Sequence, residues 1–255
     1  MGNRVQDKVA VITGSTSGVG EGIARGLAAE GAQVVISGRN EVEGARIVAE
    51  IEDTGGKAIF HRADISSETD CLALISRAVG HYGKLDILVN CAAALAQHNF
   101  DEMTVDEWDY AYAANVRGPF ILSRAAIPFF RKQGGGNIVN IGTCMGWGGP
   151  PERIAYSTSK GALLNLTHSL ARGFIHDKIR VNWITVGWVA SPHEIALRDK
   201  THGDGKKFLD EHSDKRPLGR HETPEDIAAG VLYLVSCDGS HVTGCELNIS
   251  GGIRT

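Results

Sequence analysis

The chain has 255 residues, of which 42% are hydrophobic and 22% are charged, which fits one α/β domain with a sizeable core. Its formal net charge of −4 offers no cationic excess that would attract nucleic acid or an anionic membrane surface. The N-terminus, MGNRVQDKVAVITG, lacks the apolar run of a signal sequence. Five cysteines, an odd number without a CxxC pair, indicate neither a disulfide framework nor a metal site. We therefore expect a cytoplasmic protein that binds no metal, membrane or nucleic acid.

Short β-branched segments alternate with helical segments along the chain. Several of the expected strands are apolar on both faces, as in a buried parallel sheet. They cover residues 8–13, 32–37, 57–62, 86–90, 137–141, 180–185 and 246–250. The helical segments 18–31 and 42–56 both end in glycine, a common helix terminator. The pattern predicts a doubly wound, Rossmann-type parallel sheet of seven strands with helices on both faces, in a single domain covering residues 1–255.

One long stretch, residues 188–221, shows no clear periodicity. It is rich in charge, glycine and histidine. Long irregular segments inside a compact domain are often lids over binding sites. We therefore expect this 188–221 segment to cover the substrate.

A glycine-rich stretch, TGSTSGVGEG, directly follows the first expected strand and leads into a helix. Small residues let the backbone approach a pyrophosphate, and the unpaired N–H groups of the helix start face the anion. The alternative is an ordinary strand-to-helix turn, whereas a P-loop is excluded because no Gly-Lys-Ser/Thr follows. The residues expected to hold a dinucleotide here are Gly14, Ser15, Thr16, Ser17, Gly18, Val19 and Gly20.

The end of the second strand indicates which dinucleotide is bound. An acidic residue there would bind the ribose hydroxyls of NAD, but this chain has Gly38 and Arg39. An empty space and a fixed guanidinium favour a 2′-phosphate, so NADP(H) is expected to be preferred, with NAD(H) possible. Alternatively, Arg39 stacks on the adenine or lies in solvent. Asp64 and Ile65, after the third strand, are placed to meet the adenine, although Asp64 could instead cap a helix with Ser66 and Ser67.

The segment AYSTSKGALLNLTHSLARG has helical periodicity, which places Tyr156 and Lys160 on one helix face. An ammonium beside a phenol favours the phenolate and lowers the phenol pKa towards a useful range. Such a tyrosine can exchange a proton with a substrate oxygen while hydride moves to or from a nicotinamide. The pair therefore predicts an acid/base centre.

Together these motifs resemble the short-chain dehydrogenase/reductase family over essentially the whole chain. TGSTSGVG matches the TGxxxGxG motif of the family, and NCAA matches its NNAG motif. NVRG contains its Asn, YSTSK matches YxxxK, and VGWVAS matches PGxxxT. PLGRHETPEDIAAGVLYLVS and TGCELNISGG resemble the C-terminal third of the family. The resemblance implies a catalytic set of Asn115, Thr143, Tyr156 and Lys160. It further implies cofactor contacts by Asn90, Ala92, Tyr156, Lys160, Gly187 and Val189. A homotetramer built on the helices after Val105 and Ala155 and on the last strand is also implied.

The chain departs from the family pattern at several positions. Cys91 and Ala93 replace an Asn and a Gly, Val186 replaces a Pro, and Ser250 stands where an acidic residue is common. Thr143 replaces the usual serine, which keeps the hydroxyl and adds a methyl group. The first four changes affect the support of the site, whereas Thr143 is a change within the catalytic set.

The motifs favour an NADP(H)-preferring short-chain alcohol dehydrogenase or carbonyl reductase that interconverts a secondary alcohol and a ketone, with Tyr156 as general acid/base. One alternative is an inactive dinucleotide-binding sensor or scaffold. Another makes Cys144 a thiol nucleophile, although no histidine partner is evident. The residues expected around the small-molecule substrate are Ala94, Leu95, Met145, Trp147, Trp188 and His193.

Overall fold

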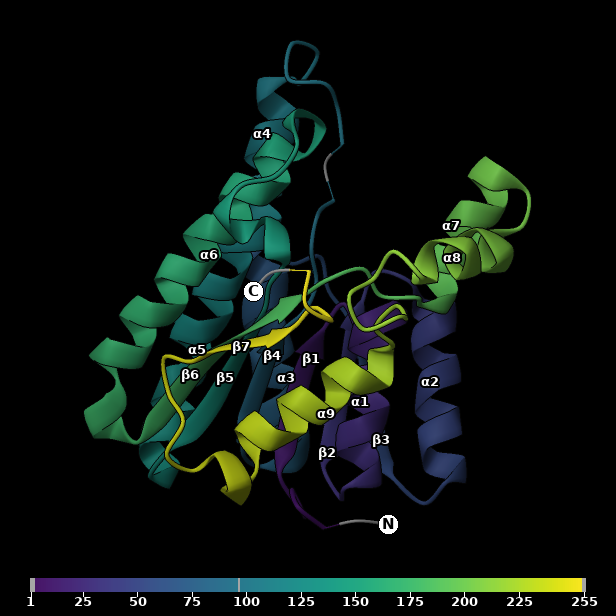
Figure 1. The fold of residues 1–255 in the computed structure, drawn as a ribbon. Helices are drawn as coiled ribbons and strands as arrows, with labels where there is room; N and C mark the ends of the chain where they lie inside the picture. The colour runs from purple at the N-terminus through teal and green to yellow at the C-terminus, as the bar shows by residue number, and fades with distance from the viewer. Residues whose placement is uncertain (1–2, 96, 254–255) are drawn as a thin grey trace.

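The computed structural model describes residues 3–95 and 97–253, in which seven strands form one parallel sheet (Figure 1). Every predicted strand is confirmed to within one residue at each end. The strands lie in the order β3-β2-β1-β4-β5-β6-β7, so β2 and β3 are added on one side of β1 and β4 to β7 on the other. Their bounds are β1 Val9–Thr13, β2 Gln33–Gly38, β3 Lys57–Arg62, β4 Ile87–Asn90, β5 Gly136–Ile141, β6 Ile179–Val186 and β7 Glu246–Ile249.

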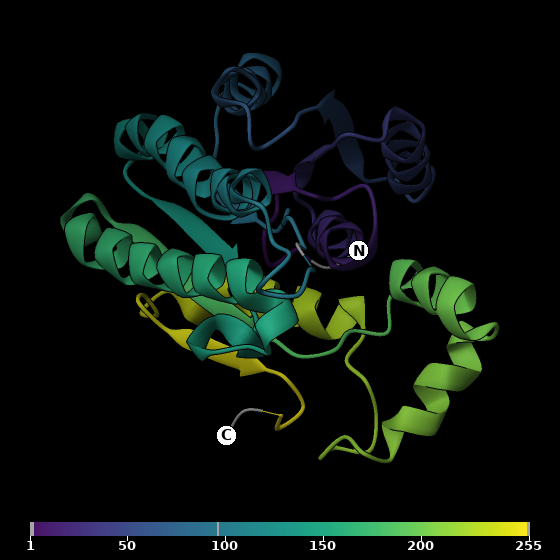
Figure 2. The ribbon, with the colours of Figure 1, turned by 90° about the horizontal axis from the view of Figure 1, so that it is seen from above.

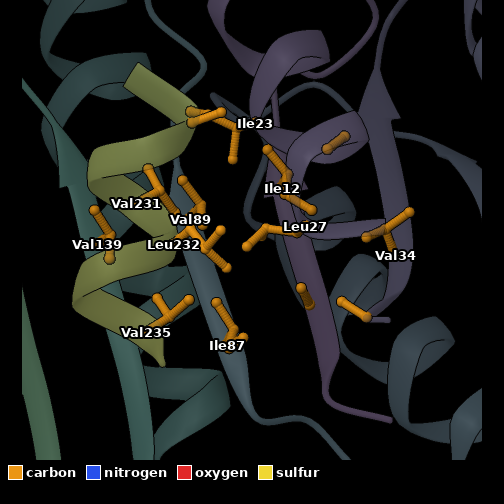
Figure 3. Close-up of a cluster of buried hydrophobic side chains, with 14 of the residues drawn as sticks. Ile12, Ile23, Leu27, Val34, Ile87, Val89, Val139, Val231, Leu232 and Val235 are labelled. Carbon is orange, nitrogen blue, oxygen red and sulfur yellow. The ribbon is translucent and has the colours of Figure 1, made fainter. Parts of the chain in front are cut away.

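Helices cover both faces of the sheet, which explains why the central strands are apolar on both sides. One face packs against α1 (Gly18–Ala29), α2 (Glu41–Asp53) and α9 (Pro224–Val235). The other packs against α3 (Glu68–Tyr82), α5 (Gly118–Gln133) and α6 (Ile154–Gly173). Figure 3 shows the first core, where Ile23 and Leu27 of α1 meet Val231 of α9 above β1 and β4. The predicted doubly wound fold is therefore confirmed.

The helix ends follow the local sequence. Asn40 caps α2 by accepting from the Glu43 N–H at 3.2 Å. Ser67 caps α3 in the same way, accepting from Asp70 N–H at 3.3 Å. After α1, Gly31 takes a positive φ of 92°, a conformation that costs glycine little. The two predicted helices begin within one residue of the expected start, and they end two and three residues before the expected glycines.

The 188–221 segment is more regular than its sequence predicts. It contains α7 (Pro192–His202) and α8 (Gly205–Ser213), so the expectation of an irregular stretch is wrong. Ser191 and Asp204 cap these helices, and the aromatic ring of Phe208 in α8 stacks on His202 of α7. Seen from above, the two helices lie to one side of the strand ends, across from α4 (Val105–Tyr112) and α6 (Figure 2).

Two features are absent from the described residues. No helix among them is both long enough and apolar enough to cross a bilayer. Within the same residues, no group of three His, Cys, Asp or Glu side chains could hold a metal ion.

Candidate active site

A cleft of about 780 Å³ lies at the carboxyl ends of the strands. It begins at the glycine-rich loop after β1 and extends past Tyr156 to Trp188 in the loop after β6. Ligands of doubly wound sheets bind at this edge, where the strand order reverses. The position of the cleft thus follows from the topology.

The glycine-rich loop has the geometry needed for close approach to a phosphate. Gly14 has a φ of 66°, and a Cβ there would lie 2.7 Å from the Cα of Ala92. The N-cap residue of α1, Ser17, makes no side-chain cap hydrogen bond, so its side chain leaves the N–H groups of the first turn to a ligand. A loop with a glycine at its closest approach and a helix start without a side-chain cap together fit the pyrophosphate of a dinucleotide.

Most of the predicted cofactor residues line the cleft, but two do not. Ser15 is fully buried; its hydroxyl donates to Ile12 O at 2.7 Å and accepts from Ser37 N–H at 2.9 Å. Asn90 donates to the Asn140 side chain at 2.8 Å inside the sheet. Both side chains form hydrogen bonds inside the protein next to the cleft, and neither lines the cleft. Those that do are Gly14, Thr16, Ser17, Gly18, Val19, Gly20, Gly38, Arg39, Asp64, Ile65, Ala92, Tyr156, Lys160, Gly187 and Val189.

The end of β2 differs from the expected empty space. A Cβ on Gly38 would lie 2.6 Å from Thr16 Oγ1, so the Thr16 side chain occupies that position. Arg39 projects beside it; its guanidinium donates to the Tyr110 hydroxyl at 3.1 Å and lies 4.0 Å from Asp64. The site therefore presents a hydroxyl and an oriented guanidinium, which fits a phosphate ester.

Asp64 lies at the cleft and also bonds within the turn that follows β3. It lines the cleft, and its Oδ1 accepts from the Ser66 N–H at 2.9 Å and the Ser66 hydroxyl at 2.7 Å. These bonds shape the turn before α3, whereas the cap of α3 itself is Ser67. A net lowering of its pKa results, because these bonds and the charges of Arg39 and Arg62 outweigh its partial burial.

Tyr156 and Lys160 lie one turn apart on α6 and both line the cleft, as the helical spacing predicts. The Lys160 Nζ lies 5.8 Å from the centroid of the Tyr156 ring and donates to the Ile141 carbonyl at 2.8 Å. Burial lowers the pKa of Lys160 to about 8. Burial also raises the pKa of Tyr156 to about 12. In this structure the expected lowering of the phenol pKa by Lys160 does not occur, because desolvation dominates and the ammonium points to a carbonyl.

Thr143 follows β5 and faces the same phenol. Its hydroxyl partly offsets the effect of burial on the Tyr156 pKa. The same oxygen accepts from the Met145 N–H at 3.2 Å and so caps the 3₁₀ turn Cys144–Trp147. Thr143 thus combines the predicted site position with a local capping role.

Asn115 lies in a π-helical turn, Ala113–Arg117, between α4 and α5. Such turns often reposition a functional side chain. Asn115 accepts from the Ala94 N–H at 2.7 Å and donates to the Ala94 carbonyl at 3.0 Å and the Ser159 hydroxyl at 3.0 Å. It joins the loop after β4 to α6 and does not itself line the cleft.

Four of the six predicted substrate residues line the cleft, namely Ala94, Leu95, Met145 and Trp188. Trp147 does not; its ring packs edge-on against the buried Trp183 at 6.3 Å. The side chain of His193 lies outside the described part of the structure.

Several residues that the motifs miss also line the cleft. Cys91 lies next to Lys160, and burial raises its pKa to about 12, so it is a protonated thiol at neutral pH. Arg153, Arg198 and Arg216 approach from three separate segments. No local pattern marks these arginines, because only the folded chain brings them to one site.

Comparisons with known proteins agree with this geometry. The family described as enoyl-(acyl carrier protein) reductase matches residues 14–254. A cyclopentanol dehydrogenase from Comamonas sp. is 36% identical over 249 residues, covering 98% of each chain. The structure of an actinorhodin polyketide ketoreductase variant with NADPH has a TM-score of 0.91 at 29% identity and covers 99% of both chains.

A second solved structure is equally similar. The L-sorbose reductase of Gluconobacter frateurii, complexed with NADPH and L-sorbose, has a TM-score of 0.91 at 29% identity over 98% of this chain and 97% of that one. Each of these proteins is an oxidoreductase by name. The chain belongs to the short-chain dehydrogenase/reductase family.

Proposed function

We propose that the protein is an NADP(H)-preferring oxidoreductase that interconverts a secondary alcohol and a ketone, with Tyr156 as the general acid/base. One observation carries this proposal: Tyr156, Lys160 and Thr143 line the same continuous cleft as the glycine-rich loop. Cyclopentanol is named as the substrate of one relative, and NADPH as the ligand of two structural neighbours. A bound nicotinamide would supply or accept the hydride.

The protonation states of the site favour proton donation at neutral pH. With a pKa of about 12, the Tyr156 phenol keeps its proton, so it can donate to a carbonyl oxygen as the ketone is reduced. Thr143 offers a second hydroxyl next to the phenol, able to bind the same oxygen. The cofactor-free site therefore holds the proton that ketone reduction requires.

The proposed preference for NADP(H) depends on Thr16 and Arg39. The Arg39 side chain is 67% exposed, which would allow it to reach a 2′-phosphate. Its hydrogen bond to Tyr110 limits the positions that the guanidinium can adopt. The described part of the chain places no carboxylate at the end of β2 to bind the ribose hydroxyls of NAD, since Thr16 packs against Gly38 there.

The homotetramer implied by the family would use the helices after Val105 and Ala155 and the last strand, β7. Exposed apolar side chains lie on α4 and on the neighbouring α5, including Val105 and Phe120. A second hollow of about 570 Å³ lies between these helices and is lined by Tyr112, Phe120 and Leu166, among others. Such a surface fits an isologous contact within the proposed homotetramer. The cytoplasmic location stays a prediction.

The central test compares Tyr156→Phe with the unmodified protein. Turnover is measured as the absorbance change of the reduced cofactor with cyclic ketones, keto acids and polyols. Cofactor affinity is measured separately by fluorescence titration. We expect Tyr156→Phe to lower turnover about 100- to 10,000-fold with little change in cofactor affinity, because the ring remains and only the exchangeable proton is lost.

A matched control is Tyr82→Phe, which makes the same change on α3 outside the cleft and should leave turnover unchanged. Turnover by Tyr156→Phe within a few-fold of the unmodified protein would contradict the mechanism. Cofactor binding without turnover of any ketone in the unmodified protein would instead favour a dinucleotide sensor.

A further inference from the structure

The walls of the cleft near Tyr156 combine apolar side chains with arginines. Ala94, Leu95, Met145 and Trp188 form the apolar part. Burial of a charged group among such residues is costly unless an opposite charge is present. The arginines therefore determine whether the cleft favours a neutral or an anionic substrate.

Two of the arginines that line the cleft already face a carboxylate. Arg198 pairs with Glu194 at 2.7 Å on α7. Arg39 lies 4.0 Å from Asp64 at the adenine end. Their charges are partly balanced within the protein, so they supply little net attraction for a substrate anion.

Arg153 differs, since it forms no ion pair with any described residue. It ends the 3₁₀ turn Pro151–Arg153 and lies one turn before Tyr156. Its Nη1 donates to the Leu95 carbonyl at 3.5 Å, so the side chain reaches across to the loop after β4. Its charge also acts on the Tyr156 phenol. Most of its guanidinium donors are left for a ligand next to the reacting group.

Arg216 approaches from the loop after α8. Its guanidinium lies 4.9 Å from the centroid of the Trp188 ring, on a wall of the cleft. Its buried Nε has no hydrogen-bond partner among the described residues. The charge of Arg216 acts on the buried Glu222, but the two form no ion pair within 4.0 Å in that part of the chain. Protein atoms cover the Nε itself, but no hydrogen bond or ion pair between described residues uses the Arg216 Nη groups, which leaves them for an anion bound in the cleft.

We propose that the physiological substrate carries a carboxylate, which Arg153 and Arg216 bind while its hydroxyl or ketone meets Tyr156. This inference rests on the proposed function and specifies its substrate class as hydroxy acids and keto acids. The phosphates of the cofactor would repel such a substrate, so a local cation is needed to offset them. A carboxylate accepts two N–H bonds from one guanidinium, which also orients the substrate.

The test compares keto acids with their neutral amides. Pyruvate and levulinate are assayed against pyruvamide and levulinamide, with cyclopentanone as a neutral reference, at saturating NADPH. We expect at least one acid to exceed its amide about 10- to 100-fold in kcat/KM, the usual worth of a charge-assisted bond to a guanidinium. Pyruvate tests an anion next to the ketone, and levulinate tests a more distant one.

The double variant Arg153→Met/Arg216→Met should bring the acid-to-amide ratio to within a few-fold of one, with the amides still reduced. The single variants show how the two residues share the selectivity. Arg77→Met is the control, because it removes a charge from an exposed position of α3 outside the cleft; it should leave the acid-to-amide ratio unchanged. As a readout independent of turnover, calorimetry with the Tyr156→Phe variant and NADPH should show the acid binding more tightly than the amide.

Three results would overturn the inference. The first is a wild-type ratio of one or less, and the second is a ratio that survives in the double variant. The third is weaker NADPH binding in the Arg216→Met variant with an unchanged ratio, which would assign Arg216 to the cofactor. Reduction of cyclopentanone and the amides but not of the acids would refute only the carboxylate, whereas no turnover of any ketone would refute the proposed function itself.

Discussion

Replacing Lys160 with methionine is expected to stabilise the fold near neutral pH while it removes a proposed catalytic group. Lys160 is 2% exposed, and its ammonium is held by the Ile141 carbonyl at 2.8 Å. No described carboxylate pairs with it. Burial without a counter-charge disfavours the protonated form, and this lowers the pKa of Lys160 from 10.5 to about 8.

The size of the effect follows from this pKa. A fall from 10.5 to about 8 corresponds to about 3 kcal/mol of destabilisation when the ammonium stays charged in the folded state. Methionine has a similar shape and no charge, but it leaves the Ile141 carbonyl without its donor, at a cost of about 1–2 kcal/mol. The expected net gain is about 1–2 kcal/mol, or roughly 2–8 °C in melting temperature for a chain of this size.

The pH dependence gives the sharper test. Because the folded pKa lies below the unfolded one, the unfolded chain binds more protons between pH 8 and 10.5. The stability of the unmodified protein therefore rises relative to Lys160→Met across that window, and the advantage of the variant disappears above it. Urea denaturation of both proteins without cofactor, near neutral pH and above pH 10.5, measures this difference.

Lys57→Met is the control, since it makes the same chemical change at an exposed position on β3. It should change the free energy of unfolding little and without this pH dependence. A Lys160→Met variant that is less stable than the unmodified protein at neutral pH, or that differs from it by a constant amount at all pH values, would refute the reasoning.

Further predictions concern the cofactor, a buried carboxyl group, the phenol's neighbour and the oligomer. Arg39→Asp should reverse the preference for NADP(H) over NAD(H) in fluorescence titrations, and equal affinity of the unmodified protein for both would count against the assignment. Glu222 is 4% exposed, and burial raises its pKa, so the stability of the protein falls as pH rises above 4.5, the pKa of this group in the unfolded chain. Thermal denaturation should show Glu222→Gln to be more stable than the unmodified protein at neutral pH and to lack this pH dependence. Thr143→Ser should retain turnover, whereas Thr143→Val should lower it about 10- to 1,000-fold; a loss of melting temperature with normal turnover would leave Thr143 only its capping role. Light scattering at micromolar concentration should give a tetramer mass, and a monomer mass would disprove the proposed assembly.

The sequence by itself determined the seven strands and their order along the chain. Strands such as β1 are buried along their whole length, so their β-branched residues identify them without further information. Caps such as Asn40 and Ser67 act within three residues, which makes helix starts readable locally. The glycine-rich loop and the spacing of Tyr156 and Lys160 are equally local, which is why their shared cleft could be expected.

Tertiary structure alone decided the features that depend on burial and on distant segments. The pKa values of Tyr156 and Lys160 are governed by desolvation, which spacing does not reveal. Ser15 and Asn90 belong to the cofactor motifs, yet their side chains are used to hold neighbouring strands. Arg153 and Arg216 belong to no motif, because only the folded chain brings the start of α6 and the loop after α8 to the same cleft. Local signals depend on a few neighbouring residues, whereas charge balance in a cleft depends on every segment that the fold brings there.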